Sequence, residues 1–385
     1  MKKLEINSFG PVTGGKVEFG DITLLIGPQA SGKSLLLQLF KYAEDLSYIK
    51  STLLRYGYTW GNDYHKLIEL YFGEGMSSLL SESTKIIIDG KEFLFDSVKN
   101  PKSQKLHEEK VFYIPAQRVL TLDNGWPRNF QSFETASPFV LKNFSEALRL
   151  LMEKEFDEQP EPDIFPAKNR LNKALRDSIN SGIFSTGNII LEKQTKKRMV
   201  MKIGSHRIPF LSWSAGQKEF LSLLMSLYWL CPPAKTPMRG RVKYVVIEEP
   251  EMGLHPEAIK SLLLQSIELV SRGYKLLIST HSAVFLEFAW AFGFLREHKQ
   301  GWDRLSKLFT DKKLTQMKDN LETMLLKKNI RSYYFRRADN DVYIEDLSDL
   351  DVGSDIDYMA EWGGLSSFSE RASNVVSASV LSVNK

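Results

Sequence analysis

The sequence predicts an α/β protein in which a mixed or parallel sheet is flanked by helices. Three observations support this. Short apolar runs typical of buried strands recur along the chain, and segments with helical spacing alternate with them, as in parallel sheets covered on both faces. Polar or charged residues directly follow several of these runs, where open α/β sheets bind ligands. The four clearest runs are Asp21–Ile26, Val111–Ile114, Tyr244–Ile247 and Lys275–Ser279.

The bulk properties exclude several classes of protein. The 385 residues predict two or three structural units, and a net charge of +4 permits a nucleic-acid partner without arguing for one. Cys231 is the single cysteine, which excludes an internal disulfide and fits a reducing compartment. Because the N-terminus lacks a signal-peptide pattern and no apolar run approaches the ~18 residues of a membrane span, we expect a cytoplasmic protein with no membrane segment.

We divide the chain into four segments. Residues 1–124 form the first part of the principal domain and contain the strands Lys3–Asn7 and Lys16–Phe19, the helix Ser34–Glu44, and a hairpin turning at Asp89-Gly90. Residues 125–186 contain the amphipathic helix Leu141–Phe156, the breaker Gln159–Pro162 and the helix Arg170–Ile179, which together predict a helical insert, a lid or a short arm.

Residues 187–295 return to the principal domain, and residues 296–385 form a small α+β extension. The third segment has two strand patterns followed by helices at Gln217–Leu230 and Pro256–Arg272. The extension has two helical patterns, a hairpin of Ser332–Arg337 with Asp341–Glu345, and a serine-rich end over Ser366–Lys385.

One motif indicates phosphate binding. The segment from Gly27 to Ser34 matches G-x-x-x-x-G-K-S between a predicted strand and a predicted helix. Glycines let backbone N–H groups converge on phosphate oxygens at a helix N-terminus. Lys33 should reach the β- and γ-phosphates and Ser34 should bind Mg²⁺. The alternative is a glycine-rich turn with an incidental lysine. The predicted nucleotide contacts are Gly27, Pro28, Gln29, Ala30, Ser31, Gly32, Lys33, Ser34 and Leu35.

Two carboxylates follow the apolar strand Tyr244–Ile247. Hydrolysis of a triphosphate with Mg²⁺ requires one carboxylate near the metal and one that orients the attacking water. We assign the first role to Glu248 and the second to Glu249. The alternative is a solvated acidic turn. We favour it less because the phosphate loop supplies the other half of a site for triphosphate hydrolysis.

His281 follows the strand Lys275–Ser279. A lone histidine is more often a capping or packing residue. Its position one strand after Glu249 instead favours contact with the γ-phosphate or its attacking water. We therefore predict Lys33, Glu249 and His281 as the catalytic residues.

A second anion site is predicted before the helix Gln217–Leu230. Ser214 and Gly216 could simply cap this helix, and they could also bind phosphate with its free N–H groups. One chain cannot easily direct two such sites at one triphosphate, whereas two chains packed head to tail can.

The order of these motifs resembles the head of ABC-type ATPases. The phosphate loop, Tyr113–Arg118, Ser214–Gln217, Ile247–Glu251 and Thr280–Ser282 follow one another as in that family. The resemblance implies ATP hydrolysis and two ATP molecules held between two heads. It also implies that Gln117 senses Mg²⁺, so that Ser34, Gln117 and Glu248 surround the metal, and that Ser214, Gly216 and Gln217 meet the partner's γ-phosphate.

Within that class, the segment from Glu248 to Pro256 is most similar to OLD-like, AAA-15/21 ATPases, relatives of SMC and DNA-repair ATPases. A Toprim nuclease domain is not expected, because Asp349, Asp351, Asp355 and Asp357 lack an α/β unit around them and are interpreted as a solvated loop. The chain thus resembles the stand-alone ATPase subunits of anti-phage systems of the PARIS or Septu type.

Three functions follow from these resemblances. The first is an oligomeric defence ATPase that controls a separate effector, expected to be a nuclease, with a phage protein or DNA as its trigger. The second is a DNA-repair or DNA-organising ATPase, which predicts salt-sensitive DNA binding. The third, a transporter ATPase subunit, is weakest because the Gln117 region and the pair Glu248-Glu249 resemble the DNA-repair side.

Overall fold

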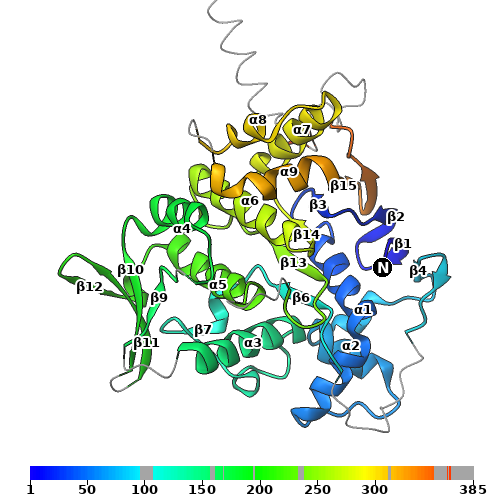
Figure 1. Ribbon diagram of the computed structural model, residues 1–385. Helices are drawn as coiled ribbons and strands as arrows, with labels where there is room; N and C mark the ends of the chain where they lie inside the picture. Colours follow the sequence, from blue (N-terminus) through cyan, green and yellow to red (C-terminus); the bar gives the residue numbers. More distant parts are fainter. Residues whose placement is uncertain are drawn as a thin grey trace, which may run out of the picture.

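The fold is described from a computed structural model of the chain (Figure 1). The structure describes residues 1–95, 107–156, 161–167, 169–193, 196–232, 238–310, 314–350, 362, 364 and 365. The serine-rich segment and three of the four aspartates, Asp351, Asp355 and Asp357, lie outside these residues. A ten-stranded mixed sheet in the order β5-β4-β1-β2-β16-β15-β3-β14-β13-β6 runs through the molecule.

Five neighbouring strands of this sheet are parallel. Ile247 pairs with Ile114 on one side and Ile278 on the other, which sets the register. The segments that follow these strands therefore emerge at the same edge of the sheet. The predicted alternation of strands and helices is confirmed here. The parallel strands are β6 (Val111–Ile114), β13 (Tyr244–Glu248), β14 (Lys275–Ser279), β3 (Ile22–Ile26) and β15 (Ile330–Ala338).

The other half of the sheet is mainly antiparallel. It begins with the hairpin of β1 and β2, against which β4 and then β5 pair. The turn at Asp89-Gly90 joins β4 to β5, as predicted. The strands of this half are β1 (Lys3–Phe9), β2 (Val12–Glu18), β4 (Lys85–Ile88), β5 (Lys91–Glu92) and β16 (Asp341–Asp346).

The C-terminal hairpin corrects the sequence prediction. The strands β15 and β16 were expected in a separate extension, but they lie inside the main sheet between β3 and β2. Tyr334 pairs with Ile26 of β3, and Phe335 and Ile344 are buried in the same core as β1 and β2. The hairpin itself could be predicted from its local sequence. The strands that lie beside it in the sheet could not, because pairing between distant strands leaves no local pattern.

Helices cover both faces of the sheet. In β3, Leu24 faces one apolar core and Leu25 faces the other. One core includes residues of α1 (Lys33–Arg55) and α2 (Tyr64–Phe72). The opposite core includes residues of α5 (Ala215–Leu230), α6 (Pro256–Ser271), α7 (Ala283–Glu297), α8 (Trp302–Ser306) and α9 (Lys318–Lys327).

The segment predicted as a helical insert also contains β-structure. The predicted helices are present as α3 (Phe139–Phe156) and α4 (Lys173–Ile179). Between them lies β9, in which Phe165 pairs with Ile189 of β10. The four-stranded sheet β12-β11-β10-β9 therefore crosses the predicted boundary at residue 186. Three residues are too few to show periodicity, which is why β9 was missed. The strands of this four-stranded sheet are β9 (Asp163–Phe165), β10 (Asn188–Lys193), β11 (Lys197–Ile203) and β12 (His206–Pro209).

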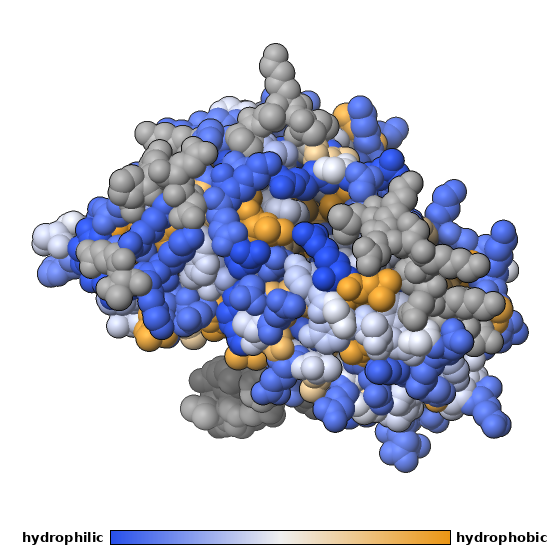
Figure 2. Space-filling view, turned by 90° about the horizontal axis from the view of Figure 1, so that it is seen from below, coloured by the Kyte–Doolittle hydropathy of each residue, from blue (hydrophilic) through white to orange (hydrophobic). Residues whose placement is uncertain are grey.

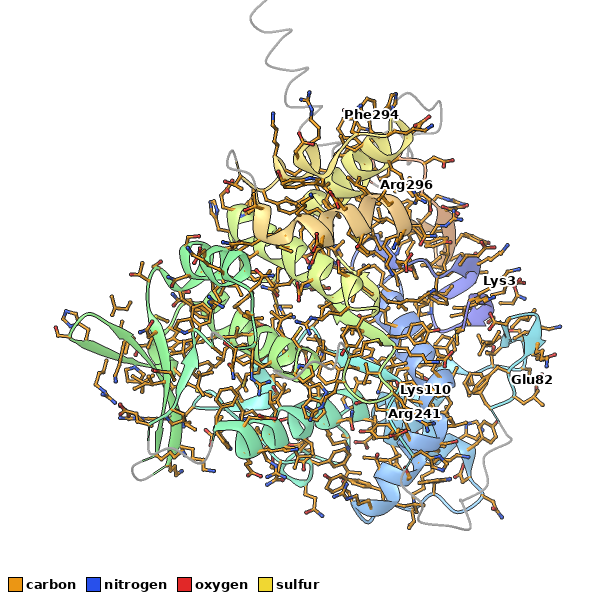
Figure 3. All side chains as sticks on the ribbon, viewed as in Figure 1. Lys3, Glu82, Lys110, Arg241, Phe294 and Arg296 are labelled. Atoms are coloured by element: carbon orange, nitrogen blue, oxygen red, sulfur yellow. The ribbon has the colours of Figure 1, made fainter. Side chains whose placement is uncertain are left out.

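Short helices and strands connect the main elements. Lys110 and Arg241 lie together near the start of β6 and β13, at the opposite end from the edge described above (Figure 3). One face of the molecule is mostly hydrophilic, with small separate hydrophobic groups (Figure 2). No helix of the described residues is both long and apolar enough to span a bilayer. The short elements are η1 (Met76–Leu79), η2 (Arg118–Thr121), β7 (Leu122–Asp123), β8 (Trp126–Pro127), η3 (Phe130–Ser132), η4 (Asn180–Phe184), η5 (Phe210–Ser212) and η6 (Thr315–Met317).

Candidate nucleotide site

The phosphate loop lies between β3 and α1, in the predicted strand–loop–helix context. Gly32 is the N-cap residue of α1 and has φ 93°. A Cβ atom there would lie 2.7 Å from a methyl carbon of Val12, so only glycine fits without displacement. Ala30 also has a left-handed backbone, with φ 56°, at a cost of ~1–2 kcal/mol. Leu35, predicted as a nucleotide contact, packs against the core shared with α2.

Lys33 folds back over the loop that precedes it. Its Nζ donates hydrogen bonds to the carbonyl oxygens of Gly27 at 2.9 Å and Pro28 at 2.7 Å. The side chain is 6% exposed. Burial lowers the pKa of the Lys33 ammonium to about 8, against the opposing influence of Glu249 and Glu251. An anion placed beside Lys33 would favour its charged form and raise this pKa.

Glu248 ends β13 in a buried position. One carboxylate oxygen, Oε2, accepts a hydrogen bond from the Ala116 N–H at 3.0 Å. Burial raises the pKa of the Glu248 carboxyl, and interaction with the Ser34 hydroxyl works in the opposite direction. The other oxygen, Oε1, is buried and has no hydrogen-bond partner among the described residues. A buried carboxylate oxygen is costly unless a hydrogen-bond donor or a cation contacts it, and a cation here would also be within reach of the Ser34 hydroxyl.

These groups fit Mg²⁺. Hydroxyl and carboxylate oxygens are the hard ligands that this ion prefers, and it usually keeps several waters and nucleotide phosphate oxygens. Among the described residues, no group of three or more His, Cys, Asp or Glu side chains could hold a metal on its own. The residues that would hold the ion with a bound nucleotide are therefore Ser34 and Glu248. Gln117 is exposed and follows Ala116 at the end of β6.

Glu249 and His281 lie next to each other, just after the ends of the neighbouring strands β13 and β14. His281 Nε2 is 3.4 Å from Glu249 Oε1, and both side chains are about one-third exposed. This hydrogen bond, more than any other influence, lowers the pKa of the Glu249 carboxyl. Glu249 has φ 40°, and its N–H donates to the carbonyl of Ser279 at 2.9 Å. The site thus holds an ionised, accessible carboxylate, which can accept a proton from water.

Two charged side chains that the sequence analysis gave no role, Glu251 and the buried Arg118, support this turn. Glu251 Oε1 accepts hydrogen bonds from the Thr280 hydroxyl at 2.8 Å and the His281 N–H at 2.6 Å, which positions the histidine. Arg118 is fully buried and donates to the carbonyls of Glu248 at 3.1 Å and Glu249 at 3.2 Å. The available signals were the acidic run after β13 and an arginine four residues after the end of β6.

Arg118 also connects the turn after β13 to α5. Its Nε lies 3.2 Å from the Glu219 carboxylate, one helical turn into α5. Burial lowers the pKa of the guanidinium and the Glu219 charge counteracts this. The planar guanidinium of Arg118 binds both α5 and the backbone of Glu249, so we expect a movement of α5 to shift Glu249 as well.

The segment Ser214–Gln217 begins α5 as a capping box. Ser214 Oγ accepts from the Gln217 N–H at 3.3 Å, and Gln217 Oε1 accepts from the Ser214 N–H at 3.1 Å. Gly216 contacts Gly253 so closely that a Cβ atom would lie 2.3 Å from the Gly253 carbonyl oxygen. In the described part of the chain, no hydrogen bond or ion pair joins this segment to the phosphate loop. His255 caps α6 by a single hydrogen bond, in which Nδ1 accepts from the Glu257 N–H at 3.3 Å.

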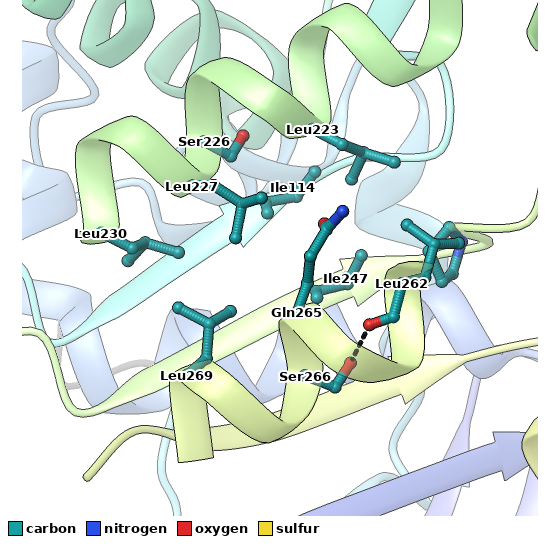
Figure 4. Close-up of a pocket in the computed structure, with 11 residues that line it drawn as sticks. Ile114, Leu223, Ser226, Leu227, Leu230, Ile247, Leu262, Gln265, Ser266 and Leu269 are labelled. Atoms are coloured by element: carbon teal, nitrogen blue, oxygen red, sulfur yellow. Dashed lines mark hydrogen bonds between the residues drawn. The ribbon is translucent and has the colours of Figure 1, made fainter. Parts of the chain in front are cut away.

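A separate cavity lies behind the turn that follows β13, between α5 and α6 (Figure 4). Apolar side chains line most of it, and the amide nitrogen of Gln265 is buried there with no hydrogen-bond partner among the described residues. Its volume of about 20 Å³ corresponds to roughly one water molecule. The cavity is therefore far too small for a nucleotide and is distinct from the site at the strand ends.

Comparison with known proteins gives one family match. A family model described as "AAA domain, putative AbiEii toxin, Type IV TA system" matches residues 22–287. The match begins at β3 and ends within α7, so it includes the phosphate loop, Glu248, Glu249 and His281. No protein of curated function matches the chain.

Solved structures similar to this chain include two SMC heads. One is the SMC head bound to the C-winged helix domain of ScpA, with 9% identity, a TM-score of 0.40, and coverage of 90% of this chain and 97% of that one. Another is the SMC head domain from Thermotoga maritima, with 11% identity, a TM-score of 0.35, and coverage of 90% and 98%.

Proposed function

This chain belongs to the AAA_21 family of AAA domains, and from that premise we propose that it binds ATP with Mg²⁺ and hydrolyses it. One observation carries the proposal. The ends of neighbouring parallel strands bring together a phosphate loop, a buried carboxylate facing Ser34, and an ionised carboxylate paired with His281. Phosphoryl transfer to water requires these three parts.

Binding would depend on the loop backbone and Lys33. N–H groups at the start of α1 present partial positive charge to phosphate oxygens. The Lys33 ammonium already lies over the loop and would exchange part of its contact with the Gly27 and Pro28 carbonyls for a phosphate oxygen. Ser34 and Glu248 would hold Mg²⁺, which supplies charge neutralisation between the β- and γ-phosphates when bound.

Hydrolysis would be assisted by Glu249. Its carboxylate orients a water molecule and accepts its proton, the water oxygen bonds to the γ-phosphorus, and the bond from that phosphorus to the bridging oxygen breaks. ADP and inorganic phosphate result. His281 keeps the Glu249 carboxylate oriented, and Glu251 in turn holds the His281 backbone.

We further propose that the complete site needs a second copy of the chain. Ser214 is exposed at the N-terminus of α5 and has no described contact with the phosphate loop of its own chain. Two large apolar side chains next to site segments are also exposed: Leu211 beside Ser214 at 67% and Leu120 beside Gln117 at 56%. Such residues support an association surface at this edge. Head-to-tail packing would present Ser214 and Gly216 to the partner's nucleotide.

Replacing Ser214 with arginine tests this arrangement. The bulky side chain should prevent a second copy from closing on the nucleotide, so we expect hydrolysis to fall at least about hundredfold, with ATP affinity within about threefold of wild type. Phosphate release and ATP binding by the purified chain measure this. Ser214→Ala removes the cap without adding bulk and should cost only ~1 kcal/mol of stability.

An arginine at Ser78, an exposed serine of η1, is the matched control and should leave hydrolysis unchanged. If Ser214→Arg hydrolyses ATP as fast as Ser78→Arg, the shared site is wrong. If the wild-type chain releases no phosphate from ATP with Mg²⁺, the enzymatic proposal itself is wrong.

For the biological role, we propose that ATP-driven assembly controls a separate effector in anti-phage defence. The family description, which names a toxin–antitoxin system, supports this assignment. The test is co-purification from the native host, with a nuclease or another toxic protein expected in the complex. Hydrolysis that requires DNA, together with DNA binding lost as salt increases, would instead indicate an enzyme that acts directly on DNA.

A further inference from the structure

Four consecutive carbonyl groups of the phosphate loop are bound by two cations from distant parts of the chain. Lys33 binds the carbonyls of Gly27 and Pro28. Arg337 Nη2 donates to the carbonyls of Gln29 at 3.1 Å and Ala30 at 3.2 Å. Arg337 belongs to β15, in the C-terminal hairpin, and the family match ends fifty residues before it (287 against 337).

These contacts fix the direction of the loop's peptide groups. In a planar trans peptide, the C=O of one residue and the N–H of the next point in opposite directions. Carbonyls of Gln29 and Ala30 that point at Arg337 therefore direct the N–H groups of Ala30 and Ser31 away from it. Ala30 is left-handed, a conformation that alanine seldom adopts without such support.

The strand β15, which carries Arg337, is held in place by pairing on both sides. β15 pairs with β3 on one side and β16 on the other. Gly27 lies so close to it that a Cβ atom would be 2.8 Å from the Phe335 carbonyl oxygen. Arg336, the preceding residue, binds Glu345 of β16 at 3.0 Å, and no hydrogen bond or ion pair to the phosphate loop is recorded for it within the described ranges.

We propose that Arg337 is a positioning residue that holds the phosphate loop in its anion-binding conformation. The C-terminal hairpin thereby sets the affinity for the phosphates of the nucleotide. The conformation of the loop then depends on a contact with a strand some three hundred residues later in the sequence. This inference rests on the proposed nucleotide site.

The test compares Arg337→Met with Arg336→Met. Methionine keeps an unbranched stem and removes the guanidinium, so Arg337→Met should weaken ATP binding about tenfold, given the usual strength of hydrogen bonds to charged groups. Arg336→Met removes a charge from the same strand and should change the dissociation constant less than twofold. Titration of each purified variant with ATP, together with its melting temperature, provides the measurement.

Two further variants separate positioning from general stability. Arg337→Lys keeps the charge but loses the planar fork, and we expect an intermediate affinity. Because glycine adopts left-handed backbone freely, Ala30→Gly should recover part of the affinity lost in Arg337→Met, without restoring its melting temperature. Equal ATP affinity in Arg337→Met and wild type, or an equal loss in Arg336→Met, would overturn the inference. A wild-type chain that binds no ATP would refute the proposed function instead.

Discussion

Replacing Glu249 with glutamine should stop ATP turnover while leaving ATP binding intact. Glutamine has nearly the same shape but cannot accept the proton of the attacking water, so hydrolysis should slow by roughly 10²–10⁴-fold. The structure makes this expectation specific, because the interaction with His281 keeps the Glu249 carboxyl ionised. Single-turnover phosphate release and ATP titration measure the two effects separately.

Glu257→Gln provides the matched control. Glu257 lies in the first turn of α6, is exposed, and pairs with Lys260 rather than with the site. The same chemical change there should leave turnover within about twofold of wild type, since exposed ion pairs contribute little. Normal turnover in Glu249→Gln would remove Glu249 from the proton-accepting role and would move attention to Glu251, the other carboxylate next to His281.

Replacing Lys33 with alanine should abolish ATP binding at ordinary concentrations. Removing one partner of a close charge pair costs ~2–5 kcal/mol, so the dissociation constant should rise at least about thirtyfold. Lys85→Ala removes an exposed lysine paired with Glu92 on an outer strand and should leave affinity unchanged. Unchanged affinity in Lys33→Ala would refute the assignment of the phosphate loop.

The pH dependence of ATP binding gives a second measure of Lys33. Burial lowers the pKa of its ammonium to about 8 in the free protein. Bound phosphate favours the charged form and raises that pKa, so binding takes up a proton above pH 8. The affinity of the wild type should therefore fall as pH rises above 8, and that pH dependence should be absent from whatever binding remains in Lys33→Ala.

Much of the site could be predicted because its parts are local in sequence. Val111–Ile114 and Lys275–Ser279 were predicted with the bounds that the structure shows, since each is a short apolar run ended by a polar segment. The phosphate loop carries its own pattern, and parallel pairing then brings Glu249 beside His281. The strands β6, β13 and β14 follow one another in the sheet as they do in the sequence, which is why the residues after them could be placed together.

The remaining features depend on contacts between distant segments. Nothing in the sequence near Arg337 indicates that its guanidinium binds the Gln29 carbonyl, some three hundred residues earlier. Arg118 was part of a recognised motif, but its burial among five backbone carbonyls was not predicted. Nor could the position of the hairpin β15–β16 inside the sheet be inferred from its own alternation.

The most direct test of the central claim, that two copies share ATP, is the mass of the Glu249→Gln variant in solution. With hydrolysis blocked, ATP and Mg²⁺ should double the mass of the particle, and ADP should not. Adding Ser214→Arg to the same chain should abolish the increase, whereas adding Ser78→Arg should not. A mass that is the same with and without ATP, or that increases equally in the Ser214→Arg double variant, would contradict the account.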